Sequence, residues 1–541
     1  MRIINLTLLI VFFVYISAKR PNVLYLHVDS MDGRTALPGS PALTPNIDAL
    51  IKRGVQFTNT YAHAPECVPS RSSLWSGRRT DRTGAYNNGR GLSVQYPIAM
   101  DRVYANGYDI GILGRRDFNF FGDSFNPAHS MFANIPSMMS EEDILTHSLS
   151  ANLSAWLRAV PDLNLPWEWT VKPTVLPNSA NKTDVHTIDW KRAEQCSQFL
   201  QDRAKNGSDT PFFVSCGFIC PHPVYKTSQY WYEKGVDASK ITLPVWGPLE
   251  EMHPVQRYES DTKDVALWPN MTVHNWDPKV IKEIRHVYYA MIAEADAFVG
   301  QVLNALKSSG LEDDTIVIFW SDHGDMTMEH RQFYKESLLE GSARVPLVIA
   351  GPGVKKGKKV TRATSLLDLF PTVMDLTQTP WPTGNYSLDG YSLLEDISDG
   401  TWETLGPHQK HPDWIFFQWH GDHTNTGQFG IRQGDWKYIR YIGYTSHLFN
   451  ITADPGELDD LATKNPDVVK KLDALLMSVV DPVAVDKAAK DWDKEMFKKW
   501  KEVQGDQWLE SLASNDLRWH PGWETNPKKW TDLINTWLAT P

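Results

Sequence analysis

The chain has 541 residues, of which 42% are hydrophobic and 22% charged, a composition typical of folded proteins and unlike that of disordered or fibrous chains. Its 65 acidic residues outnumber its 54 basic ones, and the net charge of −11 argues against a general nucleic-acid binder. At roughly 150 residues per domain, the length suits about three or four domains, or one large α/β domain with an appendage.

Residues 1–18 have the pattern of a secretory signal peptide. An apolar run from Ile3 to Ile16 follows Arg2, and small residues precede a cleavage point near Ala18. The alternative, a membrane anchor, is disfavoured because the run is shorter than the ~20 residues that span a bilayer. No later segment is long and apolar enough to span, so we expect no stable membrane insertion and a secretory, lysosomal or secreted, location.

Six Asn-x-Ser/Thr triplets agree with export and are expected to carry glycans: Asn152, Asn181, Asn206, Asn270, Asn385 and Asn450. The four cysteines are too few for a disulfide scaffold.

Short apolar runs rich in β-branched residues predict buried strands at residues 23–28, 110–113, 212–214, 315–320 and 345–350. A helical pattern over Val280–Leu306 lies between two of them. Strands that alternate with helices predict an α/β fold, with a large, mixed and mostly parallel sheet flanked by helices over residues 19–410.

The pattern changes in the last quarter of the chain. Short strand-like pieces separated by turns predict a small antiparallel sheet at residues 414–419, 430–431, 436–441 and 447–449, followed by helices. We therefore expect a C-terminal subdomain over residues 411–541. Its tryptophans are expected to pack between helices rather than to stack on sugars, with Trp519-His520 as the one pair expected near a glycan groove: Trp492, Trp500, Trp508, Trp519, Trp523, Trp530 and Trp537.

Polar side chains follow four of the predicted strands. Asp29, Arg115, His222 and the pair Asp322-His323 each come soon after an apolar run. Because ligands bind outside the carboxyl ends of strands in open α/β sheets, these residues predict one functional site at that edge.

The segment Cys67-Val68-Pro69-Ser70-Arg71 predicts the first turn of a helix that ends near Gly77. Residue 67 would then face the unpaired N–H groups at the positive end of the helix dipole. Taken alone, the pattern indicates either a nucleophilic thiolate of low pKa or a structural cysteine in a turn. Neither interpretation explains the accompanying Arg71 and carboxylates.

The Cys-x-Pro-Ser-Arg motif, with Ser321–Gly324, resembles the type I sulfatases, and the resemblance extends over nearly the whole chain. It implies an alkaline-phosphatase-like sulfatase fold and oxidation of Cys67 to formylglycine (3-oxoalanine) by the formylglycine-generating enzyme. Within that family the chain is most similar to lysosomal sulfatases that act on glucuronate 2-sulfate. Three stretches carry this similarity: Glu251–Val255, Met328–Lys335 and Leu517–His520.

The resemblance also implies roles for single residues. Asp29, residue 67, Asp322 and His323 would hold one Ca²⁺. Arg71 would polarise the formylglycine hydrate and Asp322 would take its proton. Arg115 and Lys335 would bind the sulfate group. His222 or His253 would contact the substrate and protonate the departing sugar oxygen.

Three positions depart from the family pattern. Ser30 stands where many relatives have a second Asp, and Arg115 where the usual residue is Lys. The His that often follows that Lys is absent, with Asp117 near its place. The base that expels sulfate is therefore unassigned, with His129 as a distant candidate.

The sequence thus predicts a sulfuric ester hydrolase acting on 2-O-sulfated glucuronate in glycosaminoglycan fragments. One alternative is a phosphodiesterase or phosphonate hydrolase of the same superfamily, and the other is a catalytically silent glycan-binding protein. Conversion of Cys67 leaves three cysteines, so at most one disulfide is expected among Cys196, Cys216 and Cys220.

Overall fold

A computed structural model describes most of the chain. The described residues are 20–93, 95–115, 120–121, 138–139, 153, 156–158, 160, 173–176, 181–263, 277–384, 386–407, 409–514 and 527–540. The predicted leader and the triplets at Asn152, Asn270 and Asn385 lie outside these ranges. Of the remaining triplets, Asn181 and Asn206 are exposed and Asn450 is partly exposed.

The main sheet confirms the predicted, mostly parallel architecture. Its strands run in the order β12-β2-β11-β10-β1-β8-β4, with β13 beside β2. Only β11 runs antiparallel to its neighbours, β10 and β2. The strands are β1 (Asn22–Val28), β2 (Gly54–Tyr61), β4 (Asp109–Gly114), β8 (Phe212–Gly217), β10 (Thr315–Ser321), β11 (Arg344–Ala350), β12 (Lys358–Val360) and β13 (Thr364–Ser365).

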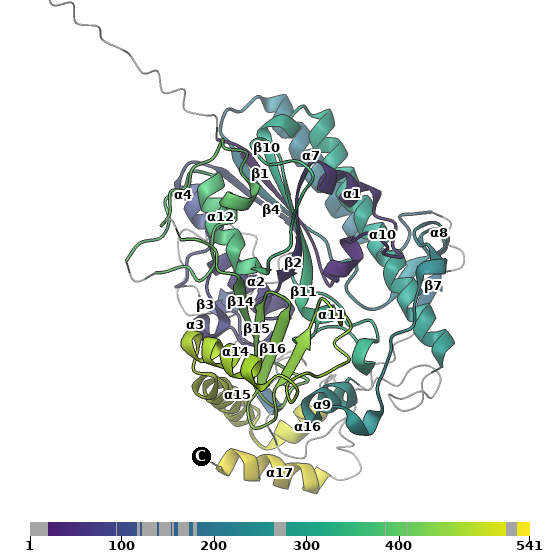
Figure 1. Ribbon diagram of the computed structural model, residues 1–541, viewed down its shortest axis with the longest axis vertical. Helices are drawn as coiled ribbons and strands as arrows, with labels where there is room; N and C mark the ends of the chain where they lie inside the picture. The colour runs from purple at the N-terminus through teal and green to yellow at the C-terminus, as the bar shows by residue number, and fades with distance from the viewer. Residues whose placement is uncertain are drawn as a thin grey trace, which may run out of the picture.

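Helices cover both faces of this sheet, as Figure 1 shows. Alternate residues of β1 serve the two faces: Leu24 and Leu26 pack toward α1, α7 and α10, whereas Val23 and Tyr25 pack toward α2, α4 and α12. Burial on both faces explains why the central strands read as continuous apolar runs. These helices are α1 (Pro45–Lys52), α2 (Cys67–Ser76), α4 (Ala99–Ala105), α7 (Thr187–Asn206), α10 (Pro278–Ser308) and α12 (Leu369–Leu376).

The second sheet is the predicted antiparallel one, with the order β14-β15-β16-β17. One face packs against α14 (Pro466–Val479). On the other face Phe417 and Tyr441 join a core with Tyr61 and Leu338 of the larger region. The boundary at residue 410 remains a prediction. The strands are β14 (Trp414–Trp419), β15 (Gln428–Gln433), β16 (Trp436–Tyr441) and β17 (His447–Asn450).

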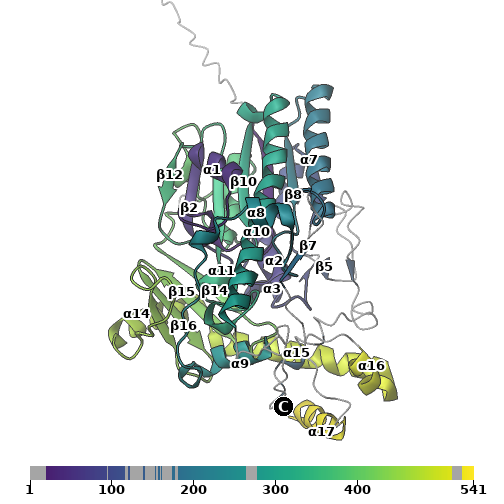
Figure 2. The same cartoon turned by 90° about the vertical axis from the view of Figure 1, so that its right-hand side faces the viewer.

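The C-terminal helices α15 (Pro482–Gln504), α16 (Trp508–Ser514) and α17 (Pro527–Ala539) lie below the main sheet in Figure 2. Their buried tryptophans form one core, which confirms the predicted packing role for Trp500, Trp508, Trp530 and Trp537. Trp519, His520 and Trp523 lie outside the described residues. Within the described ranges, no helix combines the length and apolarity needed to cross a membrane.

One disulfide joins a helix of the outer layer to the main sheet. Cys196 of α7 forms a disulfide with Cys216 of β8, and Cys67 and Cys220 are free, which agrees with the expected single disulfide. The shorter elements are α3 (Thr80–Thr83), β3 (Leu92–Ser93), β5 (Phe120–Phe121), β6 (Met138–Met139), β7 (Thr174–Leu176), β9 (Lys226–Ser228), α8 (Gln229–Lys234), α9 (Pro254–Thr262), α11 (Glu340–Ala343) and α13 (Leu394–Ile397).

Candidate active site

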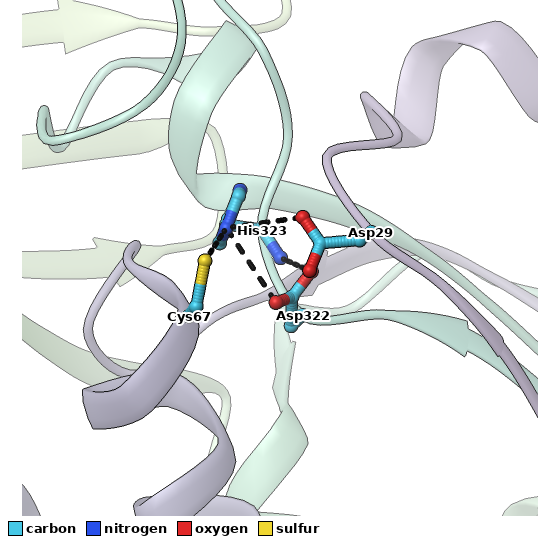
Figure 3. Close-up of side chains that lie close together, drawn as sticks. All are labelled: Asp29, Cys67, Asp322 and His323. Atoms are coloured by element: carbon cyan, nitrogen blue, oxygen red, sulfur yellow. Dashed lines mark hydrogen bonds and ion pairs between the residues drawn. The ribbon is translucent and has the colours of Figure 1, made fainter. Parts of the chain in front are cut away.

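Four buried residues meet where two central strands end and one helix begins. Val28 of β1 pairs in parallel register with Ser321 of β10, so the next residues, Asp29 and Asp322, lie side by side. His323 follows, and Cys67 approaches as the first residue of α2 (Figure 3). One ligand atom from each of the four lies within 4.8 Å of the others.

Helix α2 begins and ends as its sequence predicts. Cys67 is its first residue, and Gly77 ends it with a φ of 64°, a left-handed conformation that glycine adopts readily. The Ser70 hydroxyl donates a hydrogen bond of 2.6 Å to the Asp322 carbonyl oxygen. This contact attaches the first turn of the helix to the end of β10, and it holds residue 67 against the carboxylates.

Arg71, one helical turn beyond residue 67, joins the two carboxylates. Its Nη2 lies 3.0 Å from Asp29 Oδ2 and its Nε lies 3.0 Å from Asp322 Oδ2, with all three side chains fully buried. Arg115 adds a second guanidinium, with Nε 2.9 Å from Asp29 Oδ2. A planar guanidinium with fixed donors suits this bridging position better than an ammonium would.

The two carboxyls differ in acidity. Burial opposes ionisation of Asp29, but the positive charges of the Arg115 and Arg71 guanidinium groups outweigh it and hold the pKa of Asp29 well below its ordinary value. Burial raises the pKa of Asp322, against the influence of Arg71. Asp322 is therefore the better proton acceptor of the pair.

His323 presents an acceptor to the cluster. Its Nδ1 donates to the Gly324 carbonyl oxygen at 2.9 Å, which leaves Nε2 facing the site. Nε2 lies 3.3 Å from Cys67 Sγ, 3.7 Å from Asp29 Oδ1 and 3.5 Å from Asp322 Oδ2. One ring nitrogen, two carboxylates and the side chain of residue 67 thus converge on one small buried space. A backbone hydrogen bond at the far ring nitrogen is also typical of metal-ligating histidines, so these residues fit a divalent cation.

The surroundings of Cys67 do not favour a thiolate. Burial, together with Asp29 and Asp322, raises the pKa of the thiol to about 12, although Lys335 and Arg115 act in the opposite direction. The low-pKa thiolate considered from the sequence is therefore wrong for the unmodified residue.

Lys335 and His222 form a second pair at the site. Lys335 Nζ lies 3.0 Å from His222 Nε2, and His222 Nδ1 lies 2.6 Å from the Pro223 carbonyl oxygen, to which it donates. Burial and the adjacent ammonium of Lys335 lower the pKa of His222 well below its ordinary value. The positive charge of Lys335 acts on Cys67, which places this pair beside the cluster.

His253 lies in a different environment. It caps the N-terminus of α9, where its Nδ1 accepts from the Val255 N–H at 3.3 Å. Its ring stacks on Tyr441, and its Nε2 lies 2.9 Å from the Thr445 carbonyl oxygen. Among the interactions that the structure gives for described residues, none joins His253 to the cluster. Asp117 and His129 lie outside those residues.

Two polar residues beside the cluster were given no role from the sequence. Ser30, with a φ of 67°, donates from Oγ to Asp29 Oδ1 at 3.1 Å and from its N–H to Asp322 Oδ1 at 3.4 Å. His27 is buried, stacks on Trp320 and has its Nδ1 3.4 Å from Arg71 Nη1. A histidine inside an otherwise apolar strand was the available signal for His27.

Known proteins share both sequence and fold with this chain. A family model described as "Sulfatase" matches residues 21–379, and one described as "N-sulphoglucosamine sulphohydrolase, C-terminal" matches residues 328–482. Arylsulfatase K from Canis lupus familiaris is 37% identical over 539 residues, covering 96% of this chain and 93% of that protein.

Two solved structures share most of this fold. The phosphonate monoester hydrolase of Agrobacterium radiobacter has a TM-score of 0.63 at 24% identity, covering 85% of this chain and 95% of that one. A 2-O GAG sulfatase has a TM-score of 0.59 at 22% identity, covering 87% and 93%. At these identities the likeness demonstrates the fold alone.

Proposed function

The chain belongs to the sulfatase family and is a sulfate-ester hydrolase, and from this premise we propose that it removes 2-O-sulfate from glucuronate residues of glycosaminoglycan fragments. Residue 67 acts as formylglycine in this proposal, and one Ca²⁺ is held at the cluster. The observation that carries the proposal is the buried convergence of Asp29, Cys67, Asp322 and His323.

The cluster supplies the groups that sulfate-ester cleavage needs. Formylglycine, once formed and hydrated, supplies the hydroxyl that attacks sulfur. Asp322 accepts the proton of that hydroxyl at its carboxylate, a role that its raised pKa supports. Arg71, one turn along the same helix, holds the side chain of residue 67 beside the carboxylates. Asp29, Asp322, His323 and residue 67 would hold the cation, which supplies neutralisation of the sulfate oxygens.

Arg115 and Lys335 bind the non-bridging sulfate oxygens. The departing sugar oxygen takes its proton through His222 Nε2, which accepts a hydrogen bond from the Lys335 ammonium at 3.0 Å and receives the proton from it, since the neutral ring carries its own hydrogen on Nδ1. We assign this role to His222 rather than His253, because His222 contacts Lys335 beside the cluster whereas His253 contacts the Thr445 loop. The attack leaves sulfate bound to one oxygen of residue 67; the remaining hydroxyl of the hydrate then forms the aldehyde carbonyl as the bond from carbon to the sulfate oxygen breaks, and water rehydrates the aldehyde. The net balance is one water consumed, with the alcohol and sulfate released.

The wider setting follows from the sequence. A signal peptide at residues 1–18 directs the chain to the secretory pathway, for lysosomal or secreted use, where the formylglycine-generating enzyme modifies Cys67. Glycans are proposed at the six Asn-x-Ser/Thr triplets.

Two measurements on protein expressed through the secretory pathway test the proposal. Peptide mass spectrometry around residue 67 should find formylglycine in active enzyme, and an unmodified thiol there would refute the mechanism. Defined saccharides with 2-O-sulfo-glucuronate or 2-O-sulfo-iduronate test the substrate: release from glucuronate is expected, and none would overturn the substrate assignment. An aryl phosphonate monoester serves as the third arm, and preferential turnover of it would favour the phosphonate hydrolase alternative.

A further inference from the structure

The segment that carries Lys335 adopts backbone conformations that side-chain-bearing residues seldom adopt. Six of its non-glycine residues have φ between 43° and 76°: Thr327, Met328, His330, Arg331, Tyr334 and Glu336. Such conformations persist only where surrounding contacts hold them. The position of the Lys335 ammonium therefore depends on groups outside residues 327–336.

One of these groups is the fully buried ammonium of Lys263, the residue that follows α9. Its Nζ donates to the carbonyl oxygen of Lys335, lies 3.4 Å from Gln332 Oε1 and lies 3.5 Å from Glu336 Oε2. Lysine is rarely buried to this extent without a partner, because removing an ammonium from water is costly. Among the described residues, the hydrogen-bond and ion-pair partners of its ammonium lie in the segment that carries Lys335, and the Glu259 carboxyl on α9 also interacts with its charge.

The contacts continue toward residue 67. Glu259, on α9, accepts from Gln332 Nε2 at 3.0 Å. The Glu336 N–H donates to the Pro65 carbonyl oxygen at 3.2 Å, two residues before Cys67. The Glu336 carboxylate lies 3.5 Å from Lys263 Nζ and 4.0 Å from Lys335 Nζ. The end of α9 thus fixes the backbone that separates Lys335 from the N-terminus of α2.

We propose that Lys263 is a positioning residue for Lys335: its buried ammonium fixes the Lys335 backbone so that the side chain meets His222 at the sulfate site. This inference rests on the proposed function, since it assigns Lys263 an effect on catalysis only through the action of Lys335 on the sulfate ester. Lys263 does not touch the substrate.

The test uses the full-length modified enzyme with 4-nitrophenyl sulfate and phenyl sulfate as probes. Lys263→Met should lower kcat/KM by about 10- to 100-fold, as expected when a reacting group is displaced by about 1 Å. The loss should be larger for phenyl sulfate, whose leaving group needs the proton more. Lys437→Met is the matched control, because Lys437 is equally buried but pairs with Glu340 and Glu457. It should lower stability and leave kcat/KM of the folded enzyme unchanged.

A double-mutant cycle separates positioning from a general structural effect. In a Lys335→Ala background, Lys263→Met should cause no further loss of kcat/KM, and a full additional loss there would overturn the inference. Unchanged kcat/KM in Lys263→Met would overturn it as well. If Lys335→Ala itself has no effect, the proposed role of Lys335 fails instead. Should Lys263→Met not fold, Lys263→Gln replaces it under the same outcomes.

Discussion

Removal of the Arg71 guanidinium should destabilise the folded protein strongly. Arg71 is fully buried and lies 3.0 Å from both Asp29 and Asp322. In Arg71→Met, Asp29 keeps Arg115 at 2.9 Å, but Asp322 loses its nearest guanidinium while its carboxyl stays buried. The variant therefore breaks a buried ion pair by deleting one partner, which leaves a charge uncompensated.

The magnitude follows from this burial. Breaking a buried pair costs about 3–5 kcal/mol of unfolding free energy. A chain of 541 residues has an unfolding entropy of about 1.1 kcal/mol/K, so the melting temperature should fall by about 3–4 °C. Arg440→Met is the control, since Arg440 and Asp473 are each about 30% exposed and their pair should contribute under about 1 kcal/mol.

Urea and thermal unfolding at pH 7 in the presence of a chelator measure the effect. The chelator matters because a bound cation would itself neutralise the carboxylates and mask part of the loss. Arg71→Lys, which keeps the charge but loses the fork of donors, should fall between wild type and Arg71→Met. A loss in Arg71→Met no greater than that in Arg440→Met would refute the reasoning, because Asp29 and Asp322 would then not depend on Arg71 for their charge.

Three further predictions concern acidity, the disulfide and the leaving-group acid. Burial raises the pKa of Glu259 from its ordinary value to about 7. The folded protein therefore binds a proton at Glu259 more tightly than the unfolded chain does, which stabilises the fold by about 3 kcal/mol at low pH. This stabilisation is fully present below about pH 4.5 and is lost as the pH rises through 7. Glu259→Gln should remove this part of the difference between urea midpoints at pH 5 and pH 8, and an unchanged difference would contradict it. The Cys196–Cys216 disulfide has a sequence separation of 20, so replacing both cysteines by Ser should cost about 3 kcal/mol in urea unfolding; a loss under about 1 kcal/mol would count against it. His222→Gln should lower kcat far more for phenyl sulfate than for 4-nitrophenyl sulfate, whereas His253→Gln should lower both rates equally or not at all, and the reverse pattern would reassign the acid.

Local sequence was sufficient for the elements that are buried on both faces or begin with a strong motif. The apolar runs predicted β1, β8, β10 and β11, because a central strand covered by helices on both sides has no solvated face to interrupt the pattern. The Pro and Ser after Cys67, with Gly77 at the other end, predicted α2 for equally local reasons. Strand β2 was missed, since Gln56 and Thr60 are buried polar residues that break the apolar run.

The sequence by itself thus determined the α/β architecture, the small antiparallel sheet and the residues that follow the strands. The tertiary structure decided which of them meet. His222 pairs with Lys335, 113 residues away, and His253 lies in a separate environment. Both facts depend on strand register and on the paths of the loops, which cannot be predicted from residue types alone. The same holds for Lys263, which reads as an ordinary helix-end charge until the fold buries its ammonium against the Lys335 backbone. The spacing of apolar residues along a segment indicates which of its faces is exposed to solvent. Contacts between segments that are distant in sequence form only when the whole core packs, so this spacing does not predict them.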